Sequence, residues 1–273
     1  MSEIISAIIL GIVEGITEFL PISSTGHLIV AVALLRPQFI DTLPEGTFEI
    51  FIQLGAVLAV VVYYWRDLLR QVTTVTRDAS VQRLWLALVV AAVPAAVVGF
   101  LVRDFVKEVL FNPSVVAISL IVGGAILILI ERSRPKTTDD AEADLSSVSL
   151  RQAFLIGLVQ VLALIPGVSR AASSIIGGMA VGLNRRTATL FSFYLAIPVL
   201  GGATVVDLLL SLDEMQSEGF LYLAIGLVVS FIVALLAIGW LLRYVARNNF
   251  IPFGYYRIAA GVVILLLAAA QVL

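Results

Sequence analysis

The amino-acid sequence predicts an all-α polytopic membrane protein, organised as an inverted-topology repeat with six transmembrane helices and two re-entrant helical hairpins. The first observation is composition: 60 % of the 273 residues are hydrophobic and 13 % are charged, against about 25 % charged residues in soluble domains. The second is a series of long apolar runs, two of which are broken in the middle by proline. The third is that both halves of the chain carry the same features in the same order.

Six long apolar runs come close to the length of about 20 residues that a membrane-spanning helix needs. They cover residues 48–64, 84–101, 113–130, 188–210, 221–242 and 251–272. The N-terminal run is also apolar, but it starts without basic residues and contains Glu14 and Glu18. We therefore expect it to remain in the mature protein rather than to act as a signal peptide.

Two further apolar segments, 4–36 and 150–184, are broken halfway, the first by Pro21 and the second by Pro166 and Gly167. This pattern predicts two helical hairpins that enter the membrane and turn back. Irregular backbone at membrane depth persists only where protein or a water-filled cavity satisfies its polar groups. We therefore expect a cavity where the two turns meet.

The two halves also match in sequence. The tetrapeptide G-I-V-E at 11–14 resembles G-L-V-Q at 157–160, and the same offset aligns Ser23 with Ser169. We expect one membrane domain, 1–273, with repeat 1 at about 1–132, a mobile cytoplasmic linker at about 133–149, and repeat 2 at about 150–273. Because three spans follow each hairpin, the two repeats must face opposite ways.

Lysine and arginine are distributed unevenly between the predicted loops. If both termini face outward, the inner loops hold twelve of these residues: Arg66, Arg70, Arg77, Arg83, Arg132, Arg134, Lys136, Arg151, Arg185, Arg186, Arg243 and Arg247. The outer side holds three, Arg36, Arg103 and Lys107, together with an acidic loop that contains Asp213, Glu214 and Glu218. The positive-inside rule therefore favours this orientation.

Composition also excludes several classes of function. A formal net charge of −2 gives no indication of a nucleic-acid partner. The absence of cysteine excludes disulfides, thiol chemistry and cysteine-ligated zinc. The sequence is compatible with a homodimer and sets no oligomeric state.

Ionisable residues inside apolar segments mark the candidate site, because each costs about 2.5 to 3.5 kcal/mol to insert and therefore needs a function or a partner. Glu14 and Glu18 lie four residues apart and share one helix face. Two carboxylates held together favour a hard divalent cation, Mg²⁺ or Ca²⁺, that bridges to phosphate oxygens. The alternative is a protonated or arginine-paired structural pair.

Three hydroxyls and the single histidine of the chain follow Pro21, in the order Ser23, Ser24, Thr25 and His27. A turn of this kind can bind an anion through its amides and hydroxyls and can present a serine nucleophile beside a general base. The alternative is an ordinary helix N-cap with a structural histidine.

The second turn carries an arginine in an otherwise uncharged segment. Arg170 is expected to pair with Glu14 or Glu18, to grip phosphate oxygens, or to do both. Ser169, Ser173 and Ser174 could donate to the same anion. Arg257, in the last span, is expected to extend to the cytoplasmic face, the alternative being a charge in the interior. Glu49 and Gln53, one turn apart, are candidates for lining the cavity.

At these residues the chain resembles the undecaprenyl pyrophosphate phosphatase family of the bacitracin-resistance type. The shared segments are E-G-I-T-E-F-L-P-I-S-S-T-G-H-L, F-E-I-F-I-Q-L-G-A-V-L-A-V, P-G-V-S-R, F-S-F-Y-L-A-I-P and I-P-F-G-Y-Y-R. The resemblance implies a multi-pass enzyme of the bacterial cytoplasmic (inner) membrane with its active site open to the outer face. It further implies hydrolysis of the C55 polyprenyl diphosphate with a divalent cation, which recycles the lipid carrier of cell-wall glycan synthesis.

The resemblance also implies roles for individual residues. Glu14 and Glu18 form an E/Q-x-x-x-E element, Ser24 and His27 carry the chemistry, and Arg170 binds the phosphates. The family usually continues P-G-x-S-R with Ser-Gly and a later Thr, whereas here the sequence continues A-A-S-S. Our hypothesis is that the glutamates hold the metal, Arg170 neutralises charge, and Ser24 attacks while His27 manages the proton; attack by His27 or by water stays open.

Three other functions fit parts of the pattern. A polyprenyl-phosphate flippase or another transporter of anionic lipid would use the same repeat and broken helices. Lipid phosphatases of the acid-phosphatase type need a second histidine, which this chain lacks. An intramembrane serine protease would leave Glu14, Glu18 and Arg170 without a task.

Overall fold

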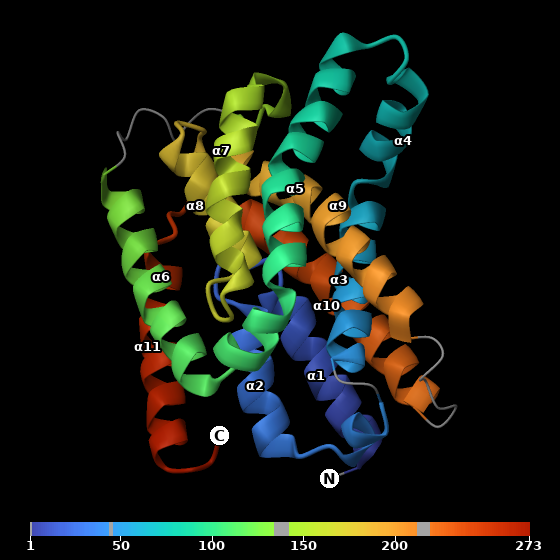
Figure 1. Ribbon diagram of the computed structural model, residues 1–273. Helices are drawn as coiled ribbons and strands as arrows, with labels where there is room; N and C mark the ends of the chain where they lie inside the picture. The colour runs from blue at the N-terminus through green and yellow to red at the C-terminus, as the bar shows by residue number, and fades with distance from the viewer. Residues whose placement is uncertain (1, 44–45, 134–141, 212–218) are drawn as a thin grey trace.

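The computed structural model describes residues 2–43, 46–133, 142–211 and 219–273, and within these ranges it contains helices and no strand (Figure 1). The α-helices, in chain order, are α1 (Glu3–Thr17), α2 (Ser24–Leu35), α3 (Thr47–Tyr63), α4 (Trp65–Thr74), α5 (Ala79–Phe105), α6 (Pro113–Ser133), α7 (Leu150–Gln160), α8 (Arg170–Ala180), α9 (Arg185–Ser211), α10 (Phe220–Val245) and α11 (Ile251–Ala269). Shorter helical turns are η1 (Gln38–Thr42), η2 (Val106–Leu110), η4 (Leu145–Ser147) and η5 (Val161–Leu164). The all-α prediction is confirmed for this part of the chain.

In the part of the chain that the structure describes, five helical stretches are long and apolar enough to cross a bilayer: Ala79–Val102, Pro113–Ser133, Arg185–Val205, Phe220–Val245 and Ile251–Ala269. Helices α3 and α4 are separated by a bend of 71°. Together they provide a sixth crossing if they count as one span. Large apolar side chains on the outside of the bundle, such as Phe100, are exposed. Such a surface suits lipid rather than water, and the chain is a multi-pass membrane protein.

The two predicted hairpins correspond to the pairs α1–α2 and α7–α8. Between the paired helices the backbone leaves the helical conformation, and Ser23 and Ser169 have φ angles of 73° and 75°. These are rare values for a residue with a side chain. Each serine caps the helix that follows it: Ser23 Oγ accepts from the Gly26 amide at 3.4 Å and Ser169 Oγ from the Ala172 amide at 3.2 Å. The two turns thus have the same local geometry.

Figure 1 shows how the hairpins lie in the molecule. Helices α1 and α2 occupy the lower half of the view and α7 and α8 the upper half, with their turns near the middle. Both ends of the chain lie at the bottom, whereas the connection between α4 and α5 lies at the top. The hairpins therefore approach the centre from opposite sides.

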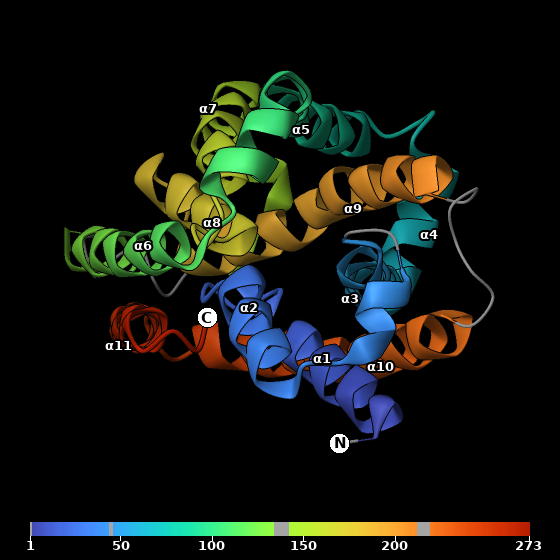
Figure 2. The same ribbon diagram turned by 60° about the horizontal axis from the view of Figure 1, so that its bottom comes forward.

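Each hairpin packs against a span from the other half of the chain, α1 against α10 and α7 against α5 (Figure 2). Glycines permit both contacts: a Cβ on Gly11 would lie 2.8 Å from the Gly226 carbonyl oxygen, and one on Gly157 would lie 2.4 Å from that of Ala91. Helices α6 and α11 also pack side by side, as do α3 and α9. The halves are interleaved, and the two turns are held inside the bundle.

The structure describes only part of the segment that was expected to be a mobile linker, about 133–149. Residues 134–141, including Arg134 and Lys136, lie outside the described residues, as does the acidic loop with Asp213, Glu214 and Glu218. The side chains of Arg103 and Lys107 are likewise not described. Within residues 142–149, Val148 is buried and the Asp144 amide donates to Thr187 Oγ1 at 3.0 Å.

Candidate active site

Two adjoining cavities lie at the predicted meeting point. The hairpin cavity, about 250 Å³, lies between the two turns and is lined by residues of both, including Glu18, Ser24, Gln160 and Arg170. The α2–α3 cavity, about 380 Å³, is lined mostly by apolar side chains of α2 and α3 together with Glu14, Glu49 and Phe111. Ser24, Thr25 and Gln53 line both cavities, so the two spaces adjoin at the start of α2.

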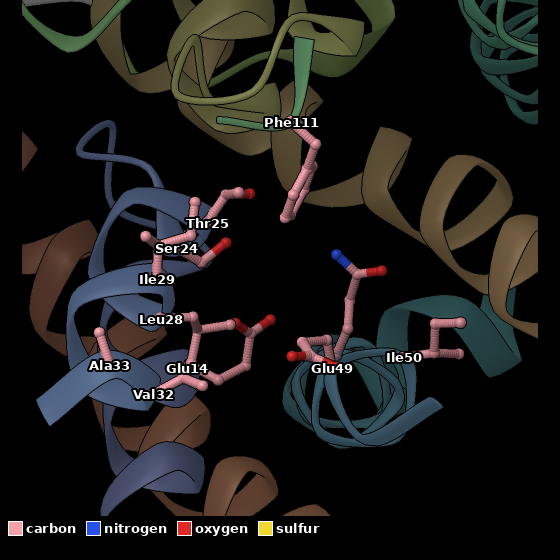
Figure 3. Close-up of a pocket in the computed structure, with 11 residues that line it drawn as sticks. Glu14, Ser24, Thr25, Leu28, Ile29, Val32, Ala33, Glu49, Ile50 and Phe111 are labelled. Atoms are coloured by element: carbon pink, nitrogen blue, oxygen red, sulfur yellow. The ribbon is translucent and has the colours of Figure 1, made fainter. Parts of the chain in front are cut away.

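Figure 3 shows the α2–α3 cavity. Ser24 and Thr25 lie on the α2 wall, Glu49 lies on the facing α3 wall, and the ring of Phe111 lies above them. Of the two residues expected to line the cavity where the turns meet, Gln53 lines both cavities and Glu49 lines the α2–α3 cavity alone. Polar groups therefore lie on both walls of a space that is otherwise lined by hydrocarbon.

The buried carboxylate of Glu18 joins the two hairpins. The Ser24 hydroxyl donates to Glu18 Oε2 at 2.8 Å, and one amino group of Arg170 donates to Glu18 Oε1 at 3.0 Å. Glu18 is 5 % exposed and Ser24 9 %. The predicted approach of Arg170 to the acidic pair is therefore present in the structure, and Glu18 is its partner.

The other amino group of Arg170 is held by α9. It donates to the carbonyl of Ser192 at 2.9 Å and to its hydroxyl at 3.2 Å. Ser174 in turn bonds the Ser192 hydroxyl at 2.7 Å and donates to the Arg170 carbonyl. The guanidinium carbon lies 5.7 Å from the centroid of the Phe19 ring, so its position is fixed on three sides. Its Nε is buried and has no hydrogen-bond partner among the described residues.

His27 lies beside the site with both ring nitrogens engaged. Nδ1 lies 2.7 Å from the Ser23 carbonyl oxygen and Nε2 lies 2.7 Å from the Tyr256 hydroxyl. Since a carbonyl only accepts, Nδ1 carries the proton, and Nε2 of the neutral ring accepts from the tyrosine. The expected contact between the Ser24 hydroxyl and the imidazole is thus replaced by one between that hydroxyl and Glu18. His27 instead supports the carbonyl that precedes Ser24.

We expect Tyr256→Phe to lower kcat by a factor of about 10, because the aromatic stack on His27 stays while the hydroxyl that fixes Nε2 is lost. His27→Gln should cost more, since it also removes the bond to the Ser23 carbonyl. Steady-state kinetics of both variants test this order. Equal, wild-type-like kcat values would show that the imidazole has no part in positioning the turn.

Glu14 differs from Glu18 in having a carboxylate oxygen without a hydrogen-bond partner among the described residues. It is 1 % exposed, lines the α2–α3 cavity, and its Oε1 has no hydrogen-bond partner among the described residues. It lies within electrostatic reach of Glu18 and Glu49. Among the described residues no group of three or more His, Cys, Asp or Glu side chains forms a ready metal cage. Glu14 therefore offers one protein ligand, an arrangement that suits a cation whose other ligands are not protein side chains.

Gln160 is a site residue that the sequence reasoning used only as a repeat match. It is 1 % exposed, it lines the hairpin cavity, and both atoms of its amide group have no partner among the described residues. It occupies in hairpin 2 the position that Glu14 occupies in hairpin 1. The exchange of a carboxylate for an amide at matched positions is the signal that could have revealed it.

The remaining predicted residues have different surroundings. Ser23, Thr25 and Ser169 line the hairpin cavity, and the two serines also cap α2 and α8. Ser173 and Ser174 are buried and line neither cavity. Ser174 bonds its own helix and Ser192, so its contacts support Arg170 rather than open space.

The expectation for Arg257 is wrong. The side chain does not extend to the cytoplasmic face, because it is 0 % exposed. Its guanidinium donates to backbone carbonyls of both turns, Pro21 at 3.1 Å and Val168 at 2.9 Å. The hydropathy of the span gave no sign of these acceptors, which come from distant parts of the chain.

Comparison with known proteins gives consistent matches over nearly the whole chain. The family model described as bacitracin resistance protein BacA matches residues 7–263. A protein of Deinococcus radiodurans named undecaprenyl-diphosphatase is 52 % identical over 268 residues, which cover 98 % of this chain and 96 % of that protein. A protein of the same name from Deinococcus deserti is 50 % identical, with 98 % and 96 % covered. Undecaprenyl-diphosphatase 1 of Chromobacterium violaceum is 46 % identical, with 95 % and 94 % covered.

Proposed function

The chain belongs to the bacitracin resistance protein BacA family, and we propose that it hydrolyses undecaprenyl diphosphate to undecaprenyl phosphate and inorganic phosphate. The observation that carries the proposal is the buried connection Ser24–Glu18–Arg170 between the two turns. It places a hydroxyl, a proton acceptor and a cation in one small cavity that adjoins an apolar one. A phosphate anhydride on a lipid tail needs both kinds of surroundings.

The reaction begins with binding of the terminal phosphate in the hairpin cavity. Arg170 exchanges its contact with Glu18 for the phosphate oxygens, which a guanidinium can hold through two N–H groups. Amide and hydroxyl groups at the starts of α2 and α8 add further donors. Because the anion enters between the turns, Arg170 and the hydroxyls of hairpin 1 meet it from opposite sides.

Ser24 Oγ then attacks the terminal phosphorus while its proton passes to Glu18 through the existing hydrogen bond. The bond between that phosphorus and the bridging oxygen breaks, and undecaprenyl phosphate leaves. Water subsequently hydrolyses the phosphoserine, which releases inorganic phosphate and restores the hydroxyl. In the alternative path water attacks directly, with Glu18 as its base; trapping of a phosphoenzyme and mapping of the label to Ser24 separates the two paths.

A divalent cation, Mg²⁺ or Ca²⁺, fits the donor set in part. The open Oε1 of Glu14 is a suitable ligand, whereas both oxygens of Glu18 are already engaged by Ser24 and Arg170. We therefore assign Glu14 as the main protein ligand and Glu18 as a second one. A cation held there would neutralise charge on the diphosphate.

The lipid tail is assigned to the α2–α3 cavity. Leu28, Ile29 and Val32 form one wall, and Ile50 and Phe111 face them. These side chains suit the first isoprenoid units next to the diphosphate. The tail then continues into the bilayer, so the substrate need not leave the membrane to react.

We further propose that the chain is one membrane domain of two inverted repeats, about 1–132 and 150–273, each starting with a re-entrant hairpin. Support comes from the matched Ser23 and Ser169 geometry and from the exchanged packing of α1 on α10 and α7 on α5. The connection between α4 and α5, which contains Arg77, lies on the side opposite the termini (Figure 1). The site then opens to the outer face of the bacterial cytoplasmic membrane.

Phosphate release from undecaprenyl diphosphate by the purified protein tests the function. We expect turnover with Mg²⁺ or Ca²⁺, and its loss on addition of a chelator. Glu14→Gln should raise the cation concentration needed for half-maximal rate. An anionic-lipid transporter would release no phosphate, and release that is indifferent to the chelator would remove the metal from the proposal.

Gln160 provides a test of the hairpin cavity. We expect Gln160→Glu to raise KM for the diphosphate by a factor of about 10, because a new carboxylate of the same size would repel the anion beside Arg170. Gln160→Leu, which removes both polar atoms and adds no charge, is the matched control and should raise KM less. Unchanged KM in both variants would place the phosphates outside this cavity.

A further inference from the structure

Arg257 forms hydrogen bonds to both turns. Its guanidinium is fully buried, and its hydrogen-bond acceptors among the described residues are all backbone carbonyls: Pro21 at 3.1 Å, Gly167 at 3.1 Å, Val168 at 2.9 Å, Ser119 at 3.4 Å and Leu120 at 3.5 Å. Pro21 belongs to the first turn, Gly167 and Val168 belong to the second, and Ser119 and Leu120 belong to α6. One side chain thus contacts three separate segments.

The acceptors in the two turns, Pro21, Gly167 and Val168, are groups that a broken helix leaves open. A carbonyl at a chain break inside the membrane has no water to bond, and its helical partner is lost. A planar guanidinium carries five donors in a fixed arrangement, which suits several carbonyls that converge from different directions. The contacts therefore satisfy both turns at once and couple their positions.

The surrounding glycines leave room for this side chain. A Cβ on Gly123 would lie 2.3 Å from one amino nitrogen of Arg257, and a Cβ on Gly124 would lie 3.0 Å from the Arg257 Cβ. The second turn is also pressed against α6, since a Cβ on Gly167 would lie 2.5 Å from the Val116 carbonyl oxygen. The two glycines of α6 thus leave space for the guanidinium between the turns.

The carbonyls that Arg257 holds lie close in sequence to the reacting groups. Pro21 precedes Ser24 by three residues, and Val168 precedes Arg170 by two. Arg257 itself lines neither the hairpin cavity nor the α2–α3 cavity. It therefore acts on the site through backbone and does not touch substrate.

We propose that Arg257 is a positioning residue. Its hydrogen bonds to both turns and to α6 set the distance between Ser24 and Arg170. The kinetic part of this inference rests on the proposed phosphatase activity. Misplacement of reacting groups by about 1 Å can cost a factor of about 10² in rate. Loss of these hydrogen bonds should therefore lower kcat and leave KM nearly unchanged, since Arg170 and the cavity walls remain.

Two pairs of variants test the proposal. Arg257→Gln should lower kcat by a factor of about 10², and Arg257→Lys should recover part of the loss because an ammonium still donates to two or three carbonyls. Gly123→Ala displaces the guanidinium without changing its charge, whereas Gly261→Ala disturbs the same α6–α11 packing away from it, with a Cβ 2.6 Å from the Ala117 carbonyl oxygen. We expect Gly123→Ala to lose kcat more than thermal stability and Gly261→Ala to show the reverse.

A distance measurement makes the test independent of activity. The chain has no cysteine, so single cysteines introduced at Leu34 and Leu162 would be the sole sites of spin labelling. These two residues are 62 % and 52 % exposed and lie on the first and second hairpins. A single narrow distance distribution in the wild type and in Gly261→Ala should broaden or shift in Arg257→Gln and Gly123→Ala. An unchanged distribution, or kcat losses in all four variants that simply follow their melting temperatures, would overturn the proposal. Failure of the wild type to release phosphate would count against the proposed function and leave the distance test valid.

Discussion

Replacement of Arg170 by alanine should reduce phosphate release by a factor of about 10³ or more, the range that arginine contributes to phosphoryl transfer. The side chain reaches the hairpin cavity from the second turn and already bonds the carboxylate that contacts the Ser24 hydroxyl. It is the cation best placed to meet charge that develops on the transferred phosphate. Alanine removes that charge and leaves Glu18 without its partner, so both binding and chemistry should suffer.

Two comparisons make the Arg170 result specific. Arg170→Lys should restore some binding but little rate, because a lysine cannot grip two oxygens in a plane. Arg151→Ala removes an exposed arginine from α7 and should keep wild-type kinetics. Near-normal turnover in a folded Arg170→Ala protein would exclude the hairpin cavity as the site of phosphate binding.

The sequence was sufficient to predict where two apolar segments are interrupted and which polar side chains lie at the interruptions. Proline and glycine mark the breaks, and charged or hydroxyl groups in apolar surroundings stand out because their insertion is costly. Pro21 and Pro166 therefore located the turns, and Arg170 was expected to approach Glu14 or Glu18. These are local signals, and they depend on residue type alone.

Contacts with backbone groups could not be predicted in the same way. Arg257 bonds carbonyls more than 80 residues away in the chain, and a carbonyl has no residue type that a sequence could show. The partner of Ser24 was ambiguous for a related reason: Glu18 precedes it by six residues and His27 follows by three, so the path of the turn decides. The structure directs the hydroxyl back to Glu18 because His27 is held by Ser23 and Tyr256.

Replacement of Glu18 by glutamine should lower kcat by a factor of about 10² to 10⁴, the range expected for loss of a general base. Glutamine has the same shape, so its amide oxygen can still accept from Ser24 while it can no longer take the proton. Because the change removes a negative charge beside the phosphate, KM for the diphosphate should stay constant or fall. A rise in KM that excess Mg²⁺ reverses would instead indicate that Glu18 acts mainly as a metal ligand.

Combination of Glu18→Gln with Ser24→Ala distinguishes one shared step from two separate ones. If the carboxylate accepts the proton of the attacking hydroxyl, removal of either group disables the same step, and the double variant should be hardly slower than the slower single variant. Thermal unfolding of all three proteins controls for the buried Arg170, which loses its carboxylate in Glu18→Gln and in the double variant but keeps it in Ser24→Ala. Additive losses would show that Glu18 and Ser24 act independently, and the proton would then need an acceptor other than the one that its hydrogen bond of 2.8 Å indicates.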